Sequence, residues 1–383
     1  MKTGIANLPL HWGRAPRWLF GRMEKLAREI TIAVVAEYGS LEMLKRLSDP
    51  YWFQAFGCVL GYDWHSSGLT TTTCGALKSG LKGLEKDLNL FVAGGKGRAS
   101  RKTPCEIKSW GDKISLGVDP KKLIYASKMS AKVDSAAVQD GYQLYHHNFF
   151  FNKEGSWAVV QQGMPTYPKS QKRNTTQNYS FFPKDKSMIQ QPSSNNQFAR
   201  RYHWYSKTVK DFVNEPQSGI CDNNSFSQVL NLTSKNSTSA RKIVSEISLE
   251  KPHKIIKEYR KILTLNLPKR EWIEQTDLRP ENLEKVMLNT YENQPRDFEE
   301  LLGLKGIGPK SIRALTLISE LAYGTKADWK DPVKYSFAHG GKDGYPYPVD
   351  KANYDKSIEI LREAIKKSKI DRSEKKNALM KLV

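Results

Sequence analysis

The spacing of apolar residues predicts a long amphipathic helix near the start of the chain. Between residues 17 and 38 apolar side chains recur every three or four positions, the repeat that places them on one helical face. They are Leu19, Met23, Leu26, Ile30, Ala33 and Val34. A second helix is predicted where Leu77, Leu81, Leu84 and Leu88 follow the same repeat, and it leads into a strand-like run at residues 91–93.

Two short runs of aromatic and β-branched residues predict a β-hairpin. Residues 149–151 are three phenylalanines, and residues 156–161 contain Trp157, Val159 and Val160. The four residues between the runs end in Gly155, a composition typical of a tight connection between antiparallel strands. The N-terminal part is therefore expected to mix helices and strands.

Polar segments divide the chain into three parts. Residues 165–198 are rich in Ser, Thr, Asn, Gln, Pro and Lys, so they predict a loop or linker rather than a core. After Lys251 a helical repeat resumes and continues to the end. These patterns predict an α+β protein with three parts: a mixed N-terminal α/β domain (1–165), a polar, partly flexible connecting region (166–248) and an all-helical domain (249–383).

The most specific local pattern is Leu-Leu-Gly-Leu-Lys-Gly-Ile-Gly-Pro-Lys-Ser-Ile-Arg-Ala-Leu at residues 301–315. It predicts a short helix that ends at Gly303, a turn through Gly306 and Gly308, and a longer helix that begins at Pro309. Glycine permits unusual backbone angles, and proline is tolerated at the first helical position because that N–H has no intrahelical partner. The amides at the start of such a helix favour an anion.

This segment resembles the helix-hairpin-helix motif of DNA repair and recombination proteins. The resemblance implies that the turn binds phosphates of the DNA backbone without reading sequence. The residues expected to bind are Gly306, Ile307, Gly308, Lys310 and Ser311. The alternative is an ordinary helical corner with no ligand.

A similarity to helix-hairpin-helix DNA glycosylases assigns two residues a catalytic role. In that family a lysine of the hairpin forms a Schiff base and an aspartate follows a Pro-Val pair, which here implies Lys310 and Asp350. Asp350 lies farther from the turn than in that family. As the alternative, it caps the helix that follows.

The charge of the chain supports a polyanionic partner. The 61 Lys and Arg against 40 Asp and Glu give a net charge of +21, which is typical of a protein that binds nucleic acid. A lysine-rich solvated surface is the alternative. The four scattered cysteines predict neither a zinc ribbon nor a disulfide framework. With neither a secretory signal nor a membrane-length apolar run, a cytoplasmic protein without a membrane partner is expected.

Polar residues of the N-terminal half are candidates for phosphodiester hydrolysis, which needs a hard cation, an activated water and a donor to phosphate. We expect Mg²⁺ or Mn²⁺ to be held by Asp63, Asp134 and Asp140. His65 or His146 is the candidate base, and Lys132 and Arg200 are candidate phosphate ligands. Asp134 and Asp140 are expected on one helix. The alternative is that these residues are caps and hydrogen bonds at the edge of the core, because no known metal-ligand spacing is present.

Aromatic and basic residues alternate around Arg200 and Arg201, next to Tyr202 and Trp204. Such a pattern favours binding of nucleic acid, with unpaired bases stacked on the rings. Core tryptophans beside extended arginines are the alternative.

The stretches 52–65 and 125–163 look like an uncharacterised family of archaea and other thermophiles, catalogued as domain of unknown function 763 and often joined to such a hairpin. The resemblance implies a prokaryotic, archaeal setting and supplies no mechanism.

We therefore expect a DNA-binding protein of DNA repair or processing. The leading expectation is a metal-dependent deoxyribonuclease that acts on structured or single-stranded DNA. The alternatives are a helix-hairpin-helix DNA glycosylase/AP lyase and a non-catalytic DNA-binding module.

Overall fold

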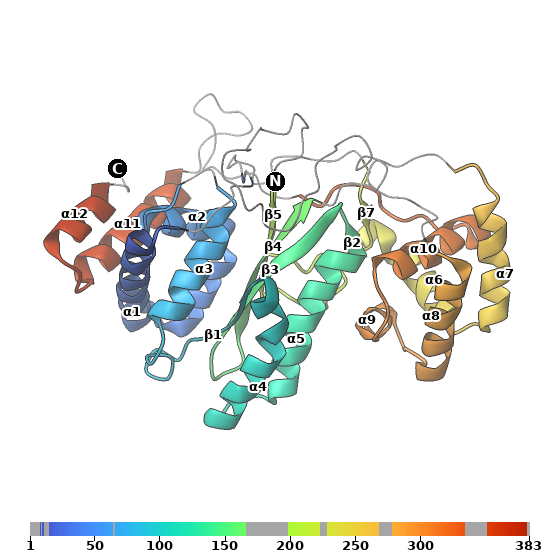
Figure 1. Ribbon diagram of the computed structural model, residues 1–383, viewed down its shortest axis with the longest axis horizontal. Helices are drawn as coiled ribbons and strands as arrows, with labels where there is room; N and C mark the ends of the chain where they lie inside the picture. The colour runs from blue at the N-terminus through green and yellow to red at the C-terminus, as the bar shows by residue number, and fades with distance from the viewer. Residues whose placement is uncertain are drawn as a thin grey trace.

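A five-stranded antiparallel sheet, in the order β1-β3-β4-β5-β6, lies at the centre of the protein (Figure 1). The computed structural model describes residues 8, 10, 15–63, 66–165, 198–222, 228–267, 278–333 and 351–380. A second, two-stranded sheet pairs β2 with β7. The strands are β1 (Phe91–Lys96), β2 (Val138–Gln139), β3 (Tyr142–Phe151), β4 (Trp157–Pro165), β5 (Arg200–Tyr205), β6 (Gly219–Cys221) and β7 (Leu230–Asn231).

Helices cover both faces of the central sheet, because both faces are apolar at its β1–β3 end. Phe149 and Phe151 of β3 enter the hydrophobic cluster with α4 and α5, whereas Phe150 between them enters the cluster with α1 to α3. These helices are α1 (Arg17–Ser48), α2 (Pro50–Val59), α3 (Gly68–Gly80), α4 (Thr103–Lys113) and α5 (Pro120–Lys132).

A group of five helices extends the α5 side of the molecule (Figure 1, right). Its apolar residues and those of the sheet form one continuous cluster, which reaches from Phe91 through Leu123 to Leu315. The helices are α6 (Thr238–Ser248), α7 (Pro252–Leu263), α8 (Pro280–Asn293), α9 (Phe298–Gly303) and α10 (Pro309–Tyr323).

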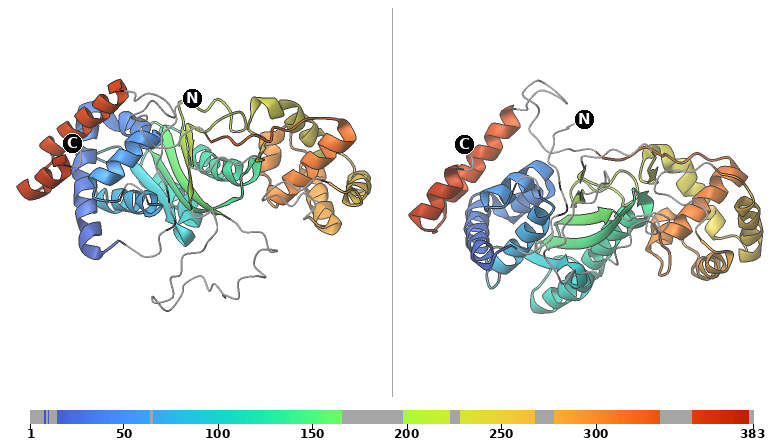
Figure 2. Two further views of the ribbon diagram at one scale, coloured as in Figure 1. Left: turned by 90° about the horizontal axis from the view of Figure 1, so that it is seen from above. Right: turned by 45° about the horizontal axis from the view of Figure 1, so that its top comes forward.

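The last two helices, α11 (Lys351–Lys367) and α12 (Arg372–Met380), pack beside α1 (Figure 2). Ile360, Leu361 and Ile365 belong to the cluster of α1 to α3. We expected residues 249–383 to form one helical domain; instead its helices divide between two clusters. The physical reason is the apolar face of α11, which is buried against α1.

The expected connecting region also contributes to the core. Strand β5 lies between β4 and β6 in the central sheet, although all six of its residues are polar or amphipathic. All six residues of β5 are buried, because hydrogen-bonding groups from other elements surround its polar side chains.

Other local predictions can be compared directly with the structure. The β3–β4 hairpin and α7 are confirmed, and the first helix continues to Ser48 across a kink at Gly39, where φ is +82°. The expected helix through Asp134 and Asp140 is wrong beyond Lys132: a π-helical turn over residues 133–137 leads into β2 instead. All four cysteines are free. Within the described ranges, no helix is long and apolar enough to cross a membrane.

Candidate nucleic-acid interface and the buried polar network

The turn between α9 and α10 has the geometry expected from its glycines and proline. α9 ends at Gly303, and α10 begins at Pro309 with Gly308 in the capping position. Gly306 has a φ of +89°, a conformation that favours glycine. Ile307, between the two glycines, is buried and anchors the turn in the hydrophobic cluster.

Three side chains from outside the turn hold alternate carbonyl groups of this segment. Asn289 donates to the carbonyl of Lys305 at 3.0 Å, and Gln139 donates to that of Pro309 at 2.8 Å. The ammonium of Lys132 donates to the carbonyl of Ile307. Since C=O and the following N–H point in opposite directions in a trans peptide, the Gly306 amide points away from Asn289 and the Gly308 amide points away from Lys132.

The outer side of the turn is open. A Cβ atom added at Gly306 or Gly308 meets no atom within 4 Å. At Gly308 the backbone is extended, with φ −149° and ψ −177°, so neither conformation nor packing requires glycine at that position. Lys305 and Lys310 are exposed beside it, whereas Ser311 is buried.

The ammonium of Lys132 contacts a protein carbonyl, whereas a catalytic or phosphate-binding lysine was expected to face a substrate. Lys132 is only half-buried, and burial lowers the pKa of its ammonium. Its ammonium donates to the carbonyl of Ile307. Through this hydrogen bond Lys132 links α5 to the α9–α10 turn and helps to hold the turn in place.

Arg200 is a buried structural cation, which corrects its expected contact with DNA. Its side chain is fully buried and forms ion pairs with Asp140 at 3.0 Å, Asp222 at 2.8 Å and Asp331 at 2.9 Å. The ring of Tyr142 lies beneath its guanidinium at 4.8 Å. Burial alone lowers the pKa of Arg200, but the three carboxylates raise it well above its ordinary value.

Arg201 is also fully buried and points to the opposite face of the sheet, so a direct contact with DNA is wrong for it as well. It donates to the hydroxyl of Thr70 at 3.2 Å and lies over the ring of Phe53. Burial lowers the pKa of Arg201 to about 10.

Asp134, an expected metal ligand, is fully buried among protein donors. Its carboxylate accepts hydrogen bonds from Trp204 and Gln217, each at 2.7 Å, and from Gln161. Burial raises the pKa of Asp134 to about 7, against the opposing effect of these three donors. The carboxylate has no exposed side from which substrate could reach it.

The remaining expected metal ligands do not join Asp134. Asp63 is exposed at the end of a described segment, and Asp140 accepts from Arg200 and from the Tyr202 hydroxyl at 2.6 Å. No group of three His, Cys, Asp or Glu side chains suited to a metal ion occurs among the residues that the structure describes. His65 and Asp350 lie outside the described residues. The nuclease and glycosylase sites thus stay predictions.

Two adjacent histidines of β3 are buried on opposite faces of the sheet. His147 forms hydrogen bonds with Ser127 at 2.9 Å and Gln161 at 2.7 Å. Among the described residues, His146, the candidate base, has no hydrogen-bond partner at either ring nitrogen. Burial lowers the pKa of His146 to about 3 and that of His147 to about 4. Both rings are therefore neutral near pH 7 and closed to substrate.

His146 belongs to a polar row that crosses the sheet. Its direct neighbours on the adjacent strands are Lys96 and Gln162, and Gln162 faces Arg201 in turn. Directly opposed residues of an antiparallel sheet project from the same face. The row was not predicted, because its members come from four strands and no sequence spacing connects them.

The network around Arg200 and Asp134 includes residues that the sequence pattern did not single out. These are Gln161, Gln217, Asp222 and Asp331. In the sequence these four residues are recognisable only as polar, and polar residues are just as common at the surface of a protein. Their role follows from burial.

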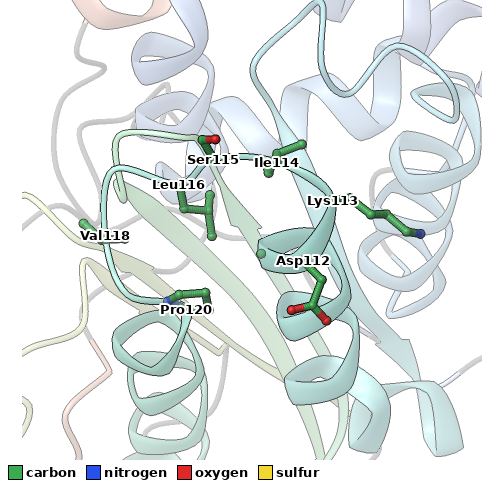
Figure 3. A pocket seen from close by; sticks show the side chains of 8 residues that line it. Asp112, Lys113, Ile114, Ser115, Leu116, Val118 and Pro120 are labelled. Carbon is green, nitrogen blue, oxygen red and sulfur yellow. The ribbon is translucent and has the colours of Figure 1, made fainter.

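A surface pocket of about 450 Å³ lies between the end of α4 and the start of α5 (Figure 3). Ile114, Leu116 and Pro120 give it an apolar part, and the side chain of Lys113 extends away from Leu116 and Pro120. Asp112 is the only carboxylate of its lining. This set of groups does not form an acid–base pair or a metal site.

Comparison with known proteins adds the family. The family model described as "Protein of unknown function (DUF763)" matches residues 4–186 and 178–349. Searches of the curated proteins and of the solved structures found no match. Because the two matched segments together extend from residue 4 to residue 349, the chain belongs to this family of unknown function.

Proposed function

We propose that this protein binds DNA in repair or processing, and that the α9–α10 turn is a helix-hairpin-helix element that holds the phosphate backbone. The observation that carries the proposal is the outward direction of the Gly306 and Gly308 amides, which follows from the hold of Asn289 and Lys132 on the carbonyls of Lys305 and Ile307. Outward amides at a helix start are donors to phosphate oxygens.

The glycine at position 308 supports the same proposal. Since the chain itself leaves space for a side chain there, glycine is explained by an external group that approaches the backbone closely. Lys305 and Lys310 beside the turn add positive charge, and the net charge of +21 favours approach of a polyanion. The contact involves backbone phosphates, so it carries no sequence preference.

The test replaces Gly308 by valine, which fits an extended backbone and places methyl groups where phosphate would lie. We expect Gly308→Val to weaken binding of duplex oligonucleotides of different sequence by the same factor, about tenfold, at an unchanged melting temperature. Binding is measured by fluorescence anisotropy from low to moderate salt. Lys310→Ala should reduce the slope of log K against log salt by about one.

Gly21→Ala is the matched control, because Gly21 on α1 also has open space around an added Cβ atom. A wild-type protein with no affinity for DNA at low salt would refute the proposal. So would a Gly308→Val protein that binds as tightly as the wild type.

A further inference from the structure

A second surface pocket, of about 530 Å³, lies between α5, β4 and the segment that follows β5. Its volume falls within the range of small-ligand sites. We call it the aromatic–lysine pocket, because three aromatic residues and three lysines line it: Tyr125, Trp157, Phe212, Lys121, Lys122 and Lys210. No expected site residue belongs to it.

The aromatic rings of this pocket are held in a fixed arrangement. Phe212 stacks on Trp157, with centroids 6.0 Å apart and planes 9° apart, and meets Tyr125 edge to face at 5.7 Å. The Tyr125 hydroxyl donates to Glu299 at 2.6 Å, and the Phe212 amide donates to the same carboxylate at 3.1 Å. One carboxylate of α9 therefore positions two rings, while 42% of Tyr125 stays exposed.

The rim of the pocket is positive. Lys121, Lys122 and Lys210 are exposed, and in the described part of the chain none of them forms an ion pair. The nearby carboxylates are engaged: Asp119 accepts from the amide of Lys121, and Asp211 accepts from the amide of Val213. Rings beside unpaired ammonium groups complement a nucleobase that carries a phosphate.

The pocket is connected to the α9–α10 turn through α5. Lys121, Tyr125 and Lys128 lie one helical turn apart on one face of α5, and Lys132 on the same face holds the turn. From residue 121 to residue 132 a helix rises about 17 Å, a length of several nucleotides. The length of α5 between the pocket and the turn therefore fits a strand that contacts both.

We propose that the aromatic–lysine pocket stacks an unpaired base of single-stranded DNA that also contacts the α9–α10 turn. The proposal rests on the proposed function and names its substrate class. A base in a duplex is stacked on both sides and cannot enter, so the pocket distinguishes single strands from duplexes. Because every base has an aromatic face, the pocket selects no sequence.

The experiment compares binding of a 20-nucleotide oligothymidine with binding of a 20-base-pair duplex by fluorescence anisotropy, using the full-length protein. Removal of one stacking ring by Tyr125→Leu should weaken oligothymidine binding by about five- to a hundredfold and leave duplex binding unchanged. Tyr125→Phe keeps the ring but loses the hydrogen bond to Glu299, so it should keep most of the affinity for oligothymidine. Tyr38→Leu is the control, since Tyr38 is a similarly exposed tyrosine on α1.

A second measurement locates the base directly. Oligothymidine with a single 5-iodouracil should cross-link on irradiation to Tyr125 or Phe212, as identified by mass spectrometry. Equal losses for the single strand and the duplex in Tyr125→Leu, no loss for either, or cross-links confined to other regions would overturn the pocket proposal and leave DNA binding at the turn intact. Failure of the wild type to bind either DNA would instead refute the proposed function.

Discussion

At the scale of single residues, the central feature is a set of charged and polar side chains that the fold encloses completely. Arg200 has three carboxylates around it, and Asp134 has three N–H donors. Burial of a charge costs several kcal/mol unless partners compensate it, so each carboxylate around Arg200 depends on the arginine. These residues stabilise one arrangement of strands, and their substitution would report on folding before it reports on catalysis.

His146 differs from this set, because its ring nitrogens have no hydrogen-bond partner in the part of the chain that the structure describes. We predict that His146→Met leaves the free energy of unfolding at pH 7.5 unchanged or higher, since an unsatisfied buried polar group is replaced by an apolar one. Urea unfolding followed by circular dichroism measures this. A large loss of stability would contradict the prediction.

The same variant should flatten the acid dependence of stability. The folded-state pKa of His146 is about 3, below its ordinary 6.5, so between these values the unfolded chain binds a proton that the folded chain does not. The contribution is full above pH 6.5 and is lost as the pH falls, by about 1.4 kcal/mol per pH unit. When the pH falls from 6.5 to 5, the free energy of unfolding should therefore decrease less in His146→Met than in the wild type. The difference is about 1.4 kcal/mol for each pH unit. His253→Gln, at an exposed histidine of α7, is the control.

At the scale of elements, the α9–α10 turn depends on helices and strands that are distant in sequence. α5 supplies Lys132, β2 supplies Gln139 and α8 supplies Asn289. Gln139 also accepts from Arg313 of α10 at 2.8 Å. The outward direction of the Gly306 and Gly308 amides thus depends on α5 and α8 as well as on the turn sequence.

We predict that Lys132→Met weakens DNA binding several-fold although Lys132 points at protein rather than at solvent. Without its ammonium the Ile307 carbonyl is no longer held inward, so the neighbouring amides lose their fixed direction. Hydrogen exchange followed by mass spectrometry should show faster exchange in residues 304–312 of the variant. Lys108→Met on α4 removes a similar charge from an exposed position and should change neither measurement. Weaker binding with unchanged exchange would point to direct phosphate contact instead.

At the scale of the whole molecule, one hydrophobic cluster extends from the α4–α5 face of the sheet into α6 to α10. The second cluster joins α1 to α3 with α11 and α12 and brings chain segments from both ends of the sequence together. Shared burial of this kind favours cooperative unfolding of the elements that share it.

We predict that Leu315→Ala on α10 destabilises the sheet together with the helices. Leu315 is fully buried, so the substitution should lower the free energy of unfolding by about 2–5 kcal/mol. Hydrogen exchange in increasing urea should show similar losses of protection in β3 and in α7. A loss restricted to the helices would show that they unfold independently.

Local sequence signals predicted those elements whose boundaries depend on a few neighbouring residues. Pro309 and Gly303 marked the ends of two helices, and the aromatic runs around Gly155 marked the β3–β4 hairpin. The end of α5 and the strand β5 were missed. The stretch with Asp134 and Asp140 was expected to be helical, but Asp134 lies in a π-helical turn and Asp140 follows β2. The polar sequence of β5 resembles a surface segment.

The candidate site shows the same division. The open turn at residues 304–309 was predicted, because glycine and proline act on the backbone within one or two residues. The expected metal site and the surface role of Arg200 depended on which side chains meet, and Arg200 meets Asp331 across 131 positions of the chain.

The sequence by itself determined the mixture of helices and strands, the β3–β4 hairpin, the helical turn with its two glycines, and the excess of positive charge. Only the tertiary structure decided that Arg200, Asp134 and the histidines of β3 are enclosed, that Lys132 and Asn289 direct the amides of the turn outward, and that α11 packs beside α1. Backbone preferences act over a few residues, whereas burial and polar pairing depend on partners that only the folded chain brings within reach.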